Sequence, residues 1–357
     1  MLNPFLGAPL AFLYGLAIDI RHKLFDLNLL RSEEYDIPIV CVGNITVGGT
    51  GKTPVTEYLI EHLATRYRVA VLSRGYKRKT KGFVLATVRS SFRQIGDEPK
   101  QIKLKYPEIP VAVCEKRTEG IRRLRELHPE INLIILDDAF QHRYVEPWVN
   151  IVLMDYNNPV YRDHLLPWGT LRDRRRQLNR AHFVLVTKCP PDMNPLDMRL
   201  VRKSLDLYPY QSLYFTRMKP DTPLPLFPDQ IQRPLNAGDP VMVLSGIANP
   251  TPFIRSLSPR YKVVGQRLFE DHHLYRTRDL EEVLEQLSQL PPETKIMTTE
   301  KDAVKLTNRK KIPVEIQRRL YYLPIRVHFV GGCEPDFLRQ LEQYVISNQK
   351  YHILHPE

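Results

Sequence analysis

Short apolar runs alternate with helix-like segments through the first two thirds of the chain. The runs read IPIVCVG, RVAVLS, PVAVC, NLIILDD, NIVLMD and HFVLVTK, and nearly all are apolar on consecutive residues. Such continuity is expected of strands that helices cover on both faces. The segment TPVTEYLIEHLATRY, after the first run, has apolar residues at helical spacing behind a proline suited to a first turn. The pattern predicts βαβ units around a mostly parallel sheet.

A proline-rich interval, residues 218–240, interrupts this alternation and predicts a connection between domains. A second set of α/β segments follows, comprising PVMVLSGI, KVVGQRLF, TKIMTTEKD, LYYLPIRVHF and a last helix with one apolar stripe. We therefore expect an α/β fold with two parts. The larger domain would span residues 1–220 and the smaller α/β domain residues 221–357.

The first 30 residues carry an apolar run, PFLGAPLAFLYGLAI, that stops before Asp19. The run is shorter than the roughly 20 residues that span a bilayer, and it lacks the basic region and cleavage site of a signal peptide. A segment lying in the membrane interface would place Arg21, His22 and Lys23 near the headgroups. A helix packed on the protein's own core fits equally well, so this segment alone leaves both interpretations open.

Charge indicates the kind of partner. The four cysteines lie far apart, without a CxxC pair or metal-like spacing, so we expect neither a disulfide framework nor a structural zinc site. The formal net charge of +12 favours an anionic partner or surface. The basic run TLRDRRRQLNR follows the apolar HLLPWG, which suits a ligand with both acyl chains and a phosphate. Nothing resembles an RNA-binding signature or a helix-turn-helix, so nucleic acid is the weaker interpretation.

The stretch VGNITVGGTGKTP predicts a phosphate-binding loop between a strand and a helix. Its glycines free backbone N–H groups to point at phosphate oxygens, Lys52 would reach the β- and γ-phosphates, and Thr53 would place its hydroxyl on Mg²⁺. The strict pattern opens with glycine, whereas this loop has Thr46 there. The expected ATP-binding residues are Thr46, Val47, Gly48, Gly49, Thr50, Gly51, Lys52, Thr53 and Pro54.

Acidic residues near this loop suggest the rest of a phosphotransferase site. The apolar run NLIILDDAF contains Asp137 and Asp138 at its end, where a nucleotide-binding sheet presents carboxylates to a metal ion. A kinase also needs a group that accepts the proton of the attacking hydroxyl. GDEP, with Asp97 and Glu98, and FEDHH are the two candidate sources, since an aspartate oriented by a histidine suits that role.

The motifs, taken in order, resemble those of the tetraacyldisaccharide 4'-kinase family, the lipid A 4'-kinases. They are VGNITVGGTGKTP, SRGY, GDEP, LDDAFQHR, LLPWGTLRD, FEDHH and TTEKDAVK, and they extend over most of the chain. This family is similar to P-loop proteins but carries Ser or Thr at the position of Thr46. The resemblance implies transfer of a phosphate from Mg²⁺-ATP to the 4'-hydroxyl of an acylated glucosamine disaccharide 1-phosphate. It also implies a peripheral protein at the cytoplasmic face of the inner membrane, with no obligate protein partner.

The resemblance also implies roles for single residues. Asp97 would be the base, with His272 as its partner and His273 as the alternative, and Arg172 would stabilise phosphate charge during transfer. GDEP and FEDHH lie in different predicted domains, so this dyad requires an interdomain cleft. Two positions depart from the family pattern, where Gly and Pro are expected: Ala139 and Thr170. The further substrate-binding candidates are Glu98, Arg117, Gln141 and His142.

A nucleotide-dependent switch or assembly ATPase that binds an anionic partner is the alternative. Guanine-nucleotide switches carry an [NT]KxD element, but VTKCPP has Pro190 where the aspartate should be. Partitioning-type ATPases carry a second lysine early in the loop, which neither Thr46 nor Val47 supplies. Steady hydrolysis without a lipid acceptor would favour this alternative. A DNA-dependent ATPase is a third, more distant hypothesis, testable by a salt-sensitive gel shift.

Overall fold

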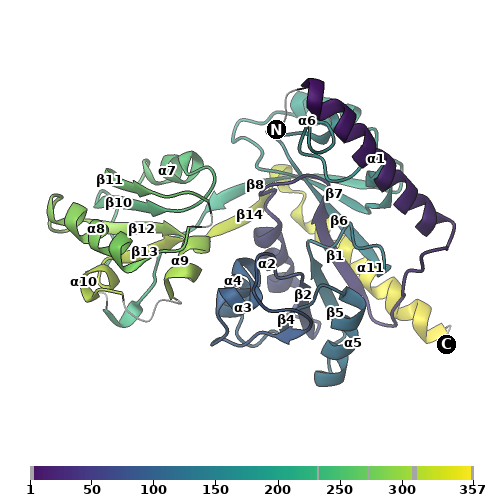
Figure 1. The fold of residues 1–357 in the computed structure, drawn as a ribbon, viewed down its shortest axis with the longest axis horizontal. Coiled ribbons are helices and arrows are strands. Elements are labelled where there is room, and N and C mark those ends of the chain that lie inside the picture. The colour runs from purple at the N-terminus through teal and green to yellow at the C-terminus, as the bar shows by residue number, and fades with distance from the viewer. Residues whose placement is uncertain (1–3, 231–232, 272, 308–311, 355–357) are drawn as a thin grey trace.

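The computed structural model describes residues 4–230, 233–271, 273–307 and 312–354. Within these residues the chain forms two α/β units, one around a nine-stranded sheet and one around a five-stranded sheet (Figure 1). The predicted fold class, a mostly parallel α/β sheet with a second, smaller α/β unit, is confirmed. Two antiparallel strands, β8 (Ser212–Pro220) and β14 (Ile325–Phe329), run between the units.

The larger sheet has the strand order β14-β8-β7-β6-β1-β5-β2-β4-β3. All neighbours are parallel except the pairs β14–β8 and β3–β4. The apolar runs predicted as strands form β1 (Ile39–Asn44), β2 (Val69–Ser73), β4 (Val111–Val113), β5 (Leu133–Asp137), β6 (Val149–Asp155) and β7 (Phe183–Thr187). The remaining short edge strand is β3 (Val84–Leu85).

Helices cover both faces of this sheet, which explains why its strands are apolar on consecutive residues. One face packs against α1 (Pro4–Asp26), α5 (Arg117–Leu127) and α6 (Pro195–Leu205). The other face packs against α2 (Lys52–Leu63), α4 (Asp97–Lys105) and α11 (Glu334–Leu354). A short helix, α3 (Phe92–Ile95), precedes α4. Because β1 and β5 are adjacent in the middle of the sheet, the loops that follow them meet at one edge.

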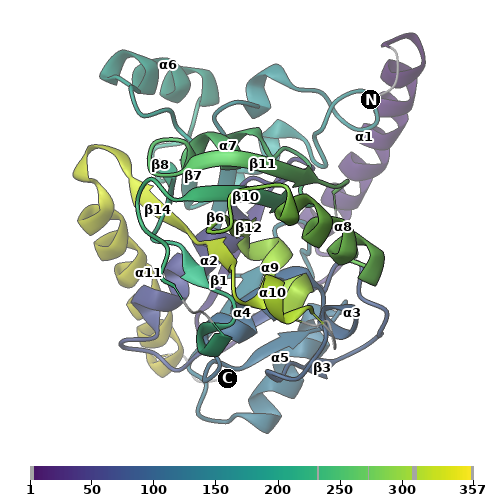
Figure 2. The same ribbon diagram turned by 90° about the vertical axis from the view of Figure 1, so that its left-hand side faces the viewer.

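The smaller sheet has the order β11-β10-β12-β13-β9. Its strands are β9 (Leu224–Pro225), β10 (Pro240–Ser245), β11 (Lys262–Leu268), β12 (Lys295–Thr299) and β13 (Leu320–Leu323). Its helices are α7 (Thr251–Leu257), α8 (Thr277–Ser288), α9 (Glu300–Thr307) and α10 (Val314–Gln317). Viewed from the side of this unit, α9 lies against α4 of the larger unit (Figure 2).

The last 30 described residues return to the larger unit. LYYLPIRVHF, predicted as one strand, divides at Pro324 into β13 of the small sheet and β14 of the large one. Phe337, Leu341 and Val345 of α11 are then fully buried against the large sheet. The predicted domain boundary placed everything after residue 220 in the second domain, and the structure differs there because a continuous apolar run cannot show which sheet it joins.

Candidate active site

The loop between β1 and α2 has the backbone that phosphate binding requires. Gly48 has φ +105° and Gly51 has φ +88°, conformations that glycine adopts without strain. A Cβ built on Gly49 would meet no described heavy atom within 4 Å, so the loop is open on its outer side. α2 begins at Lys52, directly after the loop. Its positive N-terminal end and the loop N–H groups therefore form an anion site.

Thr46 anchors the loop from beneath. Its side chain is buried, and its hydroxyl accepts a hydrogen bond of 3.2 Å from the Asn44 amide, which also donates to the Thr50 hydroxyl at 3.0 Å. The backbone N–H of Val47, an exposed residue, donates to the carbonyl oxygen of Thr170 at 2.7 Å. Threonine in place of the usual glycine thus supplies a hydroxyl that fixes this loop to strand β1.

Two cations and one carboxylate converge beside the loop. Arg172 donates to both carboxylate oxygens of Asp138, at 2.8 and 3.3 Å, and the Lys52 ammonium lies 3.7 Å from the same carboxylate. Burial would raise the pKa of Asp138, but Lys52 and Arg172 hold it below its ordinary value, so the carboxylate is ionised. Asn44 Oδ1 accepts from Arg172 and, at 3.4 Å, from Lys52. This geometry suits the binding of a nucleotide's terminal phosphates.

Further carboxylates lie behind this cluster. Asp137 is fully buried and accepts weak hydrogen bonds from Thr56 at 3.4 Å and Ser73 at 3.3 Å. Burial, together with repulsion from Glu98 and Asp138, raises the pKa of Asp137 to about 7. Burial also raises the pKa of Glu98, although Lys52 acts against it.

The donor set fits Mg²⁺. The described residues contain no cluster of three or more His, Cys, Asp or Glu side chains arranged to hold a metal ion by themselves. Mg²⁺ usually takes only one or two protein carboxylates and completes its octahedron with phosphate and water. Asp138 and Asp137 supply such carboxylates, and a cation beside them would offset the repulsion that raises the pKa of Asp137. Thr53 is partly exposed in the first turn of α2, and Pro54 follows it.

Asp97 occupies the first position of α4, directly after Gly96, whose φ is +94°. Lys52, Asp138 and Asp97 all influence the pKa of the adjacent Glu98, so the start of α4 faces the phosphate-binding loop. Lys301 of the smaller unit also lowers that pKa. The predicted base therefore lies where the two units meet.

Of the two histidines of FEDHH, the structure describes one. His272 lies outside the described residues, so its pairing with Asp97 stays a prediction. His273 is described: its Nε2 lies 2.8 Å from an Asp279 oxygen, and its ring stacks on Phe269 with centroids 4.2 Å apart. The structure thus gives His273 partners within its own unit.

Three substrate-binding candidates follow β4 and β5 in the chain and form hydrogen bonds with backbone groups of the site. Arg117 is buried and donates to the carbonyl oxygen of Asp138 at 3.3 Å, and Gln141 donates to that of Asn44 at 2.6 Å. His142 accepts from the Arg117 backbone N–H at 3.4 Å. Burial, with Arg117 and other arginines nearby, lowers the pKa of His142 to about 4, so it is neutral at pH 7. Contact of these side chains with substrate stays a prediction.

Asn44 is a site residue that the sequence analysis missed. Asn44 lies within the stretch VGNITVGGTGKTP but outside the loop residues expected to bind ATP, and its signal is a polar residue at the buried end of an apolar strand. Its amide joins four groups of the site, and its contact with Arg172 spans 128 residues of sequence.

Replacing Asn44 with alanine should weaken ATP binding by roughly ten- to a hundredfold, because hydrogen bonds to charged groups contribute about 1.5–3 kcal/mol. Lys52 would lose the side-chain oxygen of Asn44 as a hydrogen-bond acceptor, and the phosphate-binding loop would lose its hydrogen bonds to the side chain of Asn44. Isothermal titration with ATP measures the effect, and Asn179→Ala, an exposed position, is the matched control. A dissociation constant within about twofold of the wild type in Asn44→Ala would show that the amide does not support the nucleotide site.

The fold and the site together define a P-loop-type phosphotransferase. A glycine loop joins a central strand to a helix that begins with lysine, and the neighbouring parallel strand ends in carboxylates.

Comparison with known proteins identifies the family. A family model described as Tetraacyldisaccharide-1-P 4'-kinase matches residues 4–345. A tetraacyldisaccharide 4'-kinase from Porphyromonas gingivalis is 45% identical over 93% of this chain and 95% of its own length. One from Phocaeicola vulgatus is 44% identical over 96% and 95%. The "apo" form of LpxK from Aquifex aeolicus, crystallised in complex with ATP, is 26% identical with a TM-score of 0.72, covering 95% of this chain and 98% of its own. This chain belongs to the tetraacyldisaccharide 4'-kinase family.

Proposed function

We propose that the chain is a lipid kinase of lipid A biosynthesis. It transfers the γ-phosphate of ATP to the 4'-hydroxyl of a tetraacyldisaccharide 1-phosphate. The observation that carries this proposal is the convergence of Lys52, Arg172 and Asp138 beside an open glycine loop, in a chain whose relatives are tetraacyldisaccharide 4'-kinases. The complex of the Aquifex aeolicus relative with ATP supports the choice of nucleotide.

Each residue of the site has a role in this transfer. The loop N–H groups and Lys52 bind the β- and γ-phosphates, and Arg172 stabilises the charge on the phosphoryl group as it moves. Asp97 accepts the proton that leaves the 4'-hydroxyl. Asp138, backed by Asp137, and Thr53 would hold Mg²⁺, which when bound neutralises charge on the phosphate oxygens.

The two units would close over the reacting groups. α4, which carries Asp97, contacts α9 of the smaller unit, and Lys105 of α4 forms an ion pair of 3.3 Å with Glu300 of α9. FEDHH also belongs to the smaller unit. Closure of the two units would bring His272 to Asp97. It would also exclude water, which competes with the sugar hydroxyl as acceptor.

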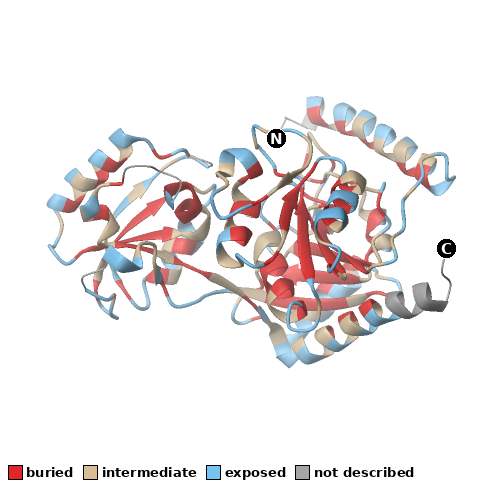
Figure 3. Cartoon of the chain, turned by 90° about the horizontal axis from the view of Figure 1, so that it is seen from below, coloured by how far each residue is buried: buried red, intermediate tan, exposed pale blue. Residues whose placement is uncertain are grey.

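α1 supports association with a membrane surface. One side packs on the large sheet through residues such as Ala11, Tyr14 and Ile18. The other side leaves apolar residues exposed, and Figure 3 shows exposed residues alternating with buried ones along α1. The described part of the chain contains no helix long and apolar enough to cross a membrane. The packed side fits a helix seated on the protein's own core, and the exposed apolar side supports the proposal that the helix rests on the cytoplasmic face of the inner membrane. The exposed apolar residues of α1 are Leu6, Leu10, Phe12, Leu13, Leu16 and Ile20.

Replacing Phe12 and Leu13 together with serine should lower partitioning onto liposomes at least about tenfold, since burying each such side chain contributes about 1.5–3 kcal/mol. These side chains are 68% and 60% exposed, so the thermal unfolding temperature should hardly change. Co-sedimentation measures the partitioning, with Leu127→Ser, an exposed apolar position on α5, as the control. Equal sedimentation of the double variant and the wild type would contradict an anchoring role.

A lipid kinase and a switch or assembly ATPase differ in whether their ATP consumption depends on the lipid acceptor. The kinase consumes ATP in proportion to added acylated disaccharide 1-phosphate and only slowly without it. Steady hydrolysis that the acceptor does not change would support the ATPase instead.

A further inference from the structure

The segment that carries Arg172 lies between the phosphate-binding loop and α1. On the loop side, the Arg172 backbone N–H donates to the carbonyl oxygen of Ile45 at 2.7 Å, one residue beyond β1. On the other side, the Tyr14 hydroxyl of α1 donates to the carbonyl oxygen of Arg172 at 2.9 Å, across 158 residues of sequence. Burial and the neighbouring Asp173 raise the pKa of the Tyr14 phenol, so it stays protonated and able to donate. The backbone of this arginine is thus held on both sides.

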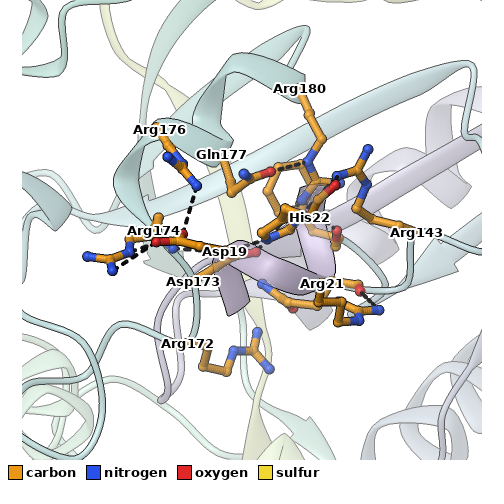
Figure 4. A network of polar contacts seen from close by, with 12 residues as sticks. Asp19, Arg21, His22, Arg143, Arg172, Asp173, Arg174, Arg176, Gln177 and Arg180 are labelled. Atoms are coloured by element: carbon orange, nitrogen blue, oxygen red, sulfur yellow. Dashed lines mark hydrogen bonds and ion pairs between the residues drawn. The ribbon is translucent and has the colours of Figure 1, made fainter. Parts of the chain in front are cut away.

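A buried pair fixes the next residue of the same segment to α1. His22 and Asp173 are 1% and 2% exposed, and His22 Nε2 lies 2.8 Å from Asp173 Oδ1 (Figure 4). The other ring nitrogen, Nδ1, lies 3.1 Å from the Arg143 guanidinium, so the network assigns Nε2 as the donor to Asp173. Asp173 also accepts from the backbone N–H of Arg174 at 2.8 Å. Removing the His22 ring would take one hydrogen bond from a buried carboxylate, which is costly.

α1 packs closely against this segment. A Cβ on Gly15 would overlap the Arg174 guanidinium and lie 2.9 Å from the Leu165 side chain. Asp19, one turn further along α1, forms ion pairs with Arg174 at 3.0 Å and Arg176 at 2.7 Å (Figure 4). Two arginines of the basic run that the sequence suggested for substrate binding, Arg174 and Arg176, therefore hold α1 in place. A shift of α1 would move the backbone of Arg172 with it.

We propose that Tyr14 and His22 are positioning residues for Arg172, so that the helix resting on the lipid surface also sets the place of the charge-stabilising arginine. The inference rests on the proposed kinase function. Arg172 reaches Asp138 and Asn44 only from a defined backbone position, and misplacement of a transition-state group by about 1 Å can cost two orders of magnitude in rate. The exposed apolar side of α1 and its arginine-facing side belong to one helix, which links contact with lipid to the geometry of transfer.

Tyr14→Phe tests the proposal with the smallest change. It keeps the ring and removes only the hydroxyl, so turnover of lipid phosphorylation should fall about three- to tenfold, the effect of one neutral hydrogen bond. The KM for ATP and liposome binding should stay as in the wild type, and the thermal unfolding temperature should fall by no more than a few degrees, the effect of one lost hydrogen bond. Tyr35→Phe, which removes a hydroxyl bonded to Glu33 at 2.8 Å in a loop away from this segment, is the matched control and should turn over normally.

A double-mutant comparison shows whether Tyr14 acts through the arginine. In an Arg172→Lys background, Tyr14→Phe should lower turnover by less than about twofold, since residues that act together are not additive. His22 gives a second measure: His22→Gln keeps an N–H for Asp173 and should retain more turnover than His22→Ala. Full additivity of Tyr14→Phe and Arg172→Lys, or unchanged turnover in Tyr14→Phe, would overturn the inference while leaving the kinase function intact. A wild type that labels no lipid would overturn the proposed function and this inference together.

Discussion

Replacing Asp97 with asparagine should lower the turnover of lipid phosphorylation by roughly 10²–10⁴-fold, the usual contribution of a general base. Asparagine has nearly the same shape but cannot take the proton of the 4'-hydroxyl. The carboxylate lies at the N-terminus of α4, next to Glu98, whose pKa Lys52 and Asp138 also influence. ATP binding should change by less than about twofold, because Asp97 does not form part of the phosphate-binding loop.

The measurement is the initial rate of label transfer from Mg²⁺-ATP to lipid, with ATP affinity determined separately by titration. Asp229→Asn, the same substitution at an exposed position of the connection between the units, controls for the change of charge. Turnover within a few fold of the wild type in Asp97→Asn would assign the base to another group. The kinase reaction itself would stand.

Arg172→Ala should lower turnover by about 10³-fold, the lower end of the contribution of an arginine that stabilises a transferring phosphoryl group. The guanidinium lies against Asp138 and Asn44, and its Nε is buried without a hydrogen-bond partner in the described part of the chain. Lysine at this position keeps the charge but not the planar fork, so Arg172→Lys should fall between alanine and the wild type.

Single-turnover transfer at saturating ATP separates this loss from weaker nucleotide binding. Arg199→Ala, an exposed arginine of α6, is the matched control. A decrease smaller than about tenfold in Arg172→Ala would mean that the arginine serves mainly as a structural partner of Asp138.

The larger sheet could be predicted from the sequence because its strands are buried on both faces and therefore read as continuous apolar runs. β8 was missed, since SLYFTRMKP mixes apolar and polar residues and pairs with β14, more than a hundred residues away. The same long-range pairing returns α11 to the larger unit. Hydrophobic pattern identifies a strand but does not say which sheet it joins.

The candidate site, like the fold, has a part that the sequence predicts and a part that it does not. Lys52 and the carboxylates after β5 were predicted because their chemistry is tied to short motifs next to a strand end. Asn44 and Tyr14 were not predicted, because their roles depend on contacts with Arg172 that span 128 and 158 residues. The basic run after residue 170 was expected to meet substrate, yet Arg174 and Arg176 bind Asp19 of α1. Charge in a sequence does not reveal whether its partner lies within the same chain.

The most direct test of the central claim is the fate of the γ-phosphate. Wild-type protein in detergent micelles is given labelled Mg²⁺-ATP with an acylated glucosamine disaccharide 1-phosphate, or with the same lipid lacking its 4'-hydroxyl. The proposed function predicts labelled lipid from the first acceptor and none from the second. Label that appears only as free inorganic phosphate with both acceptors would contradict it.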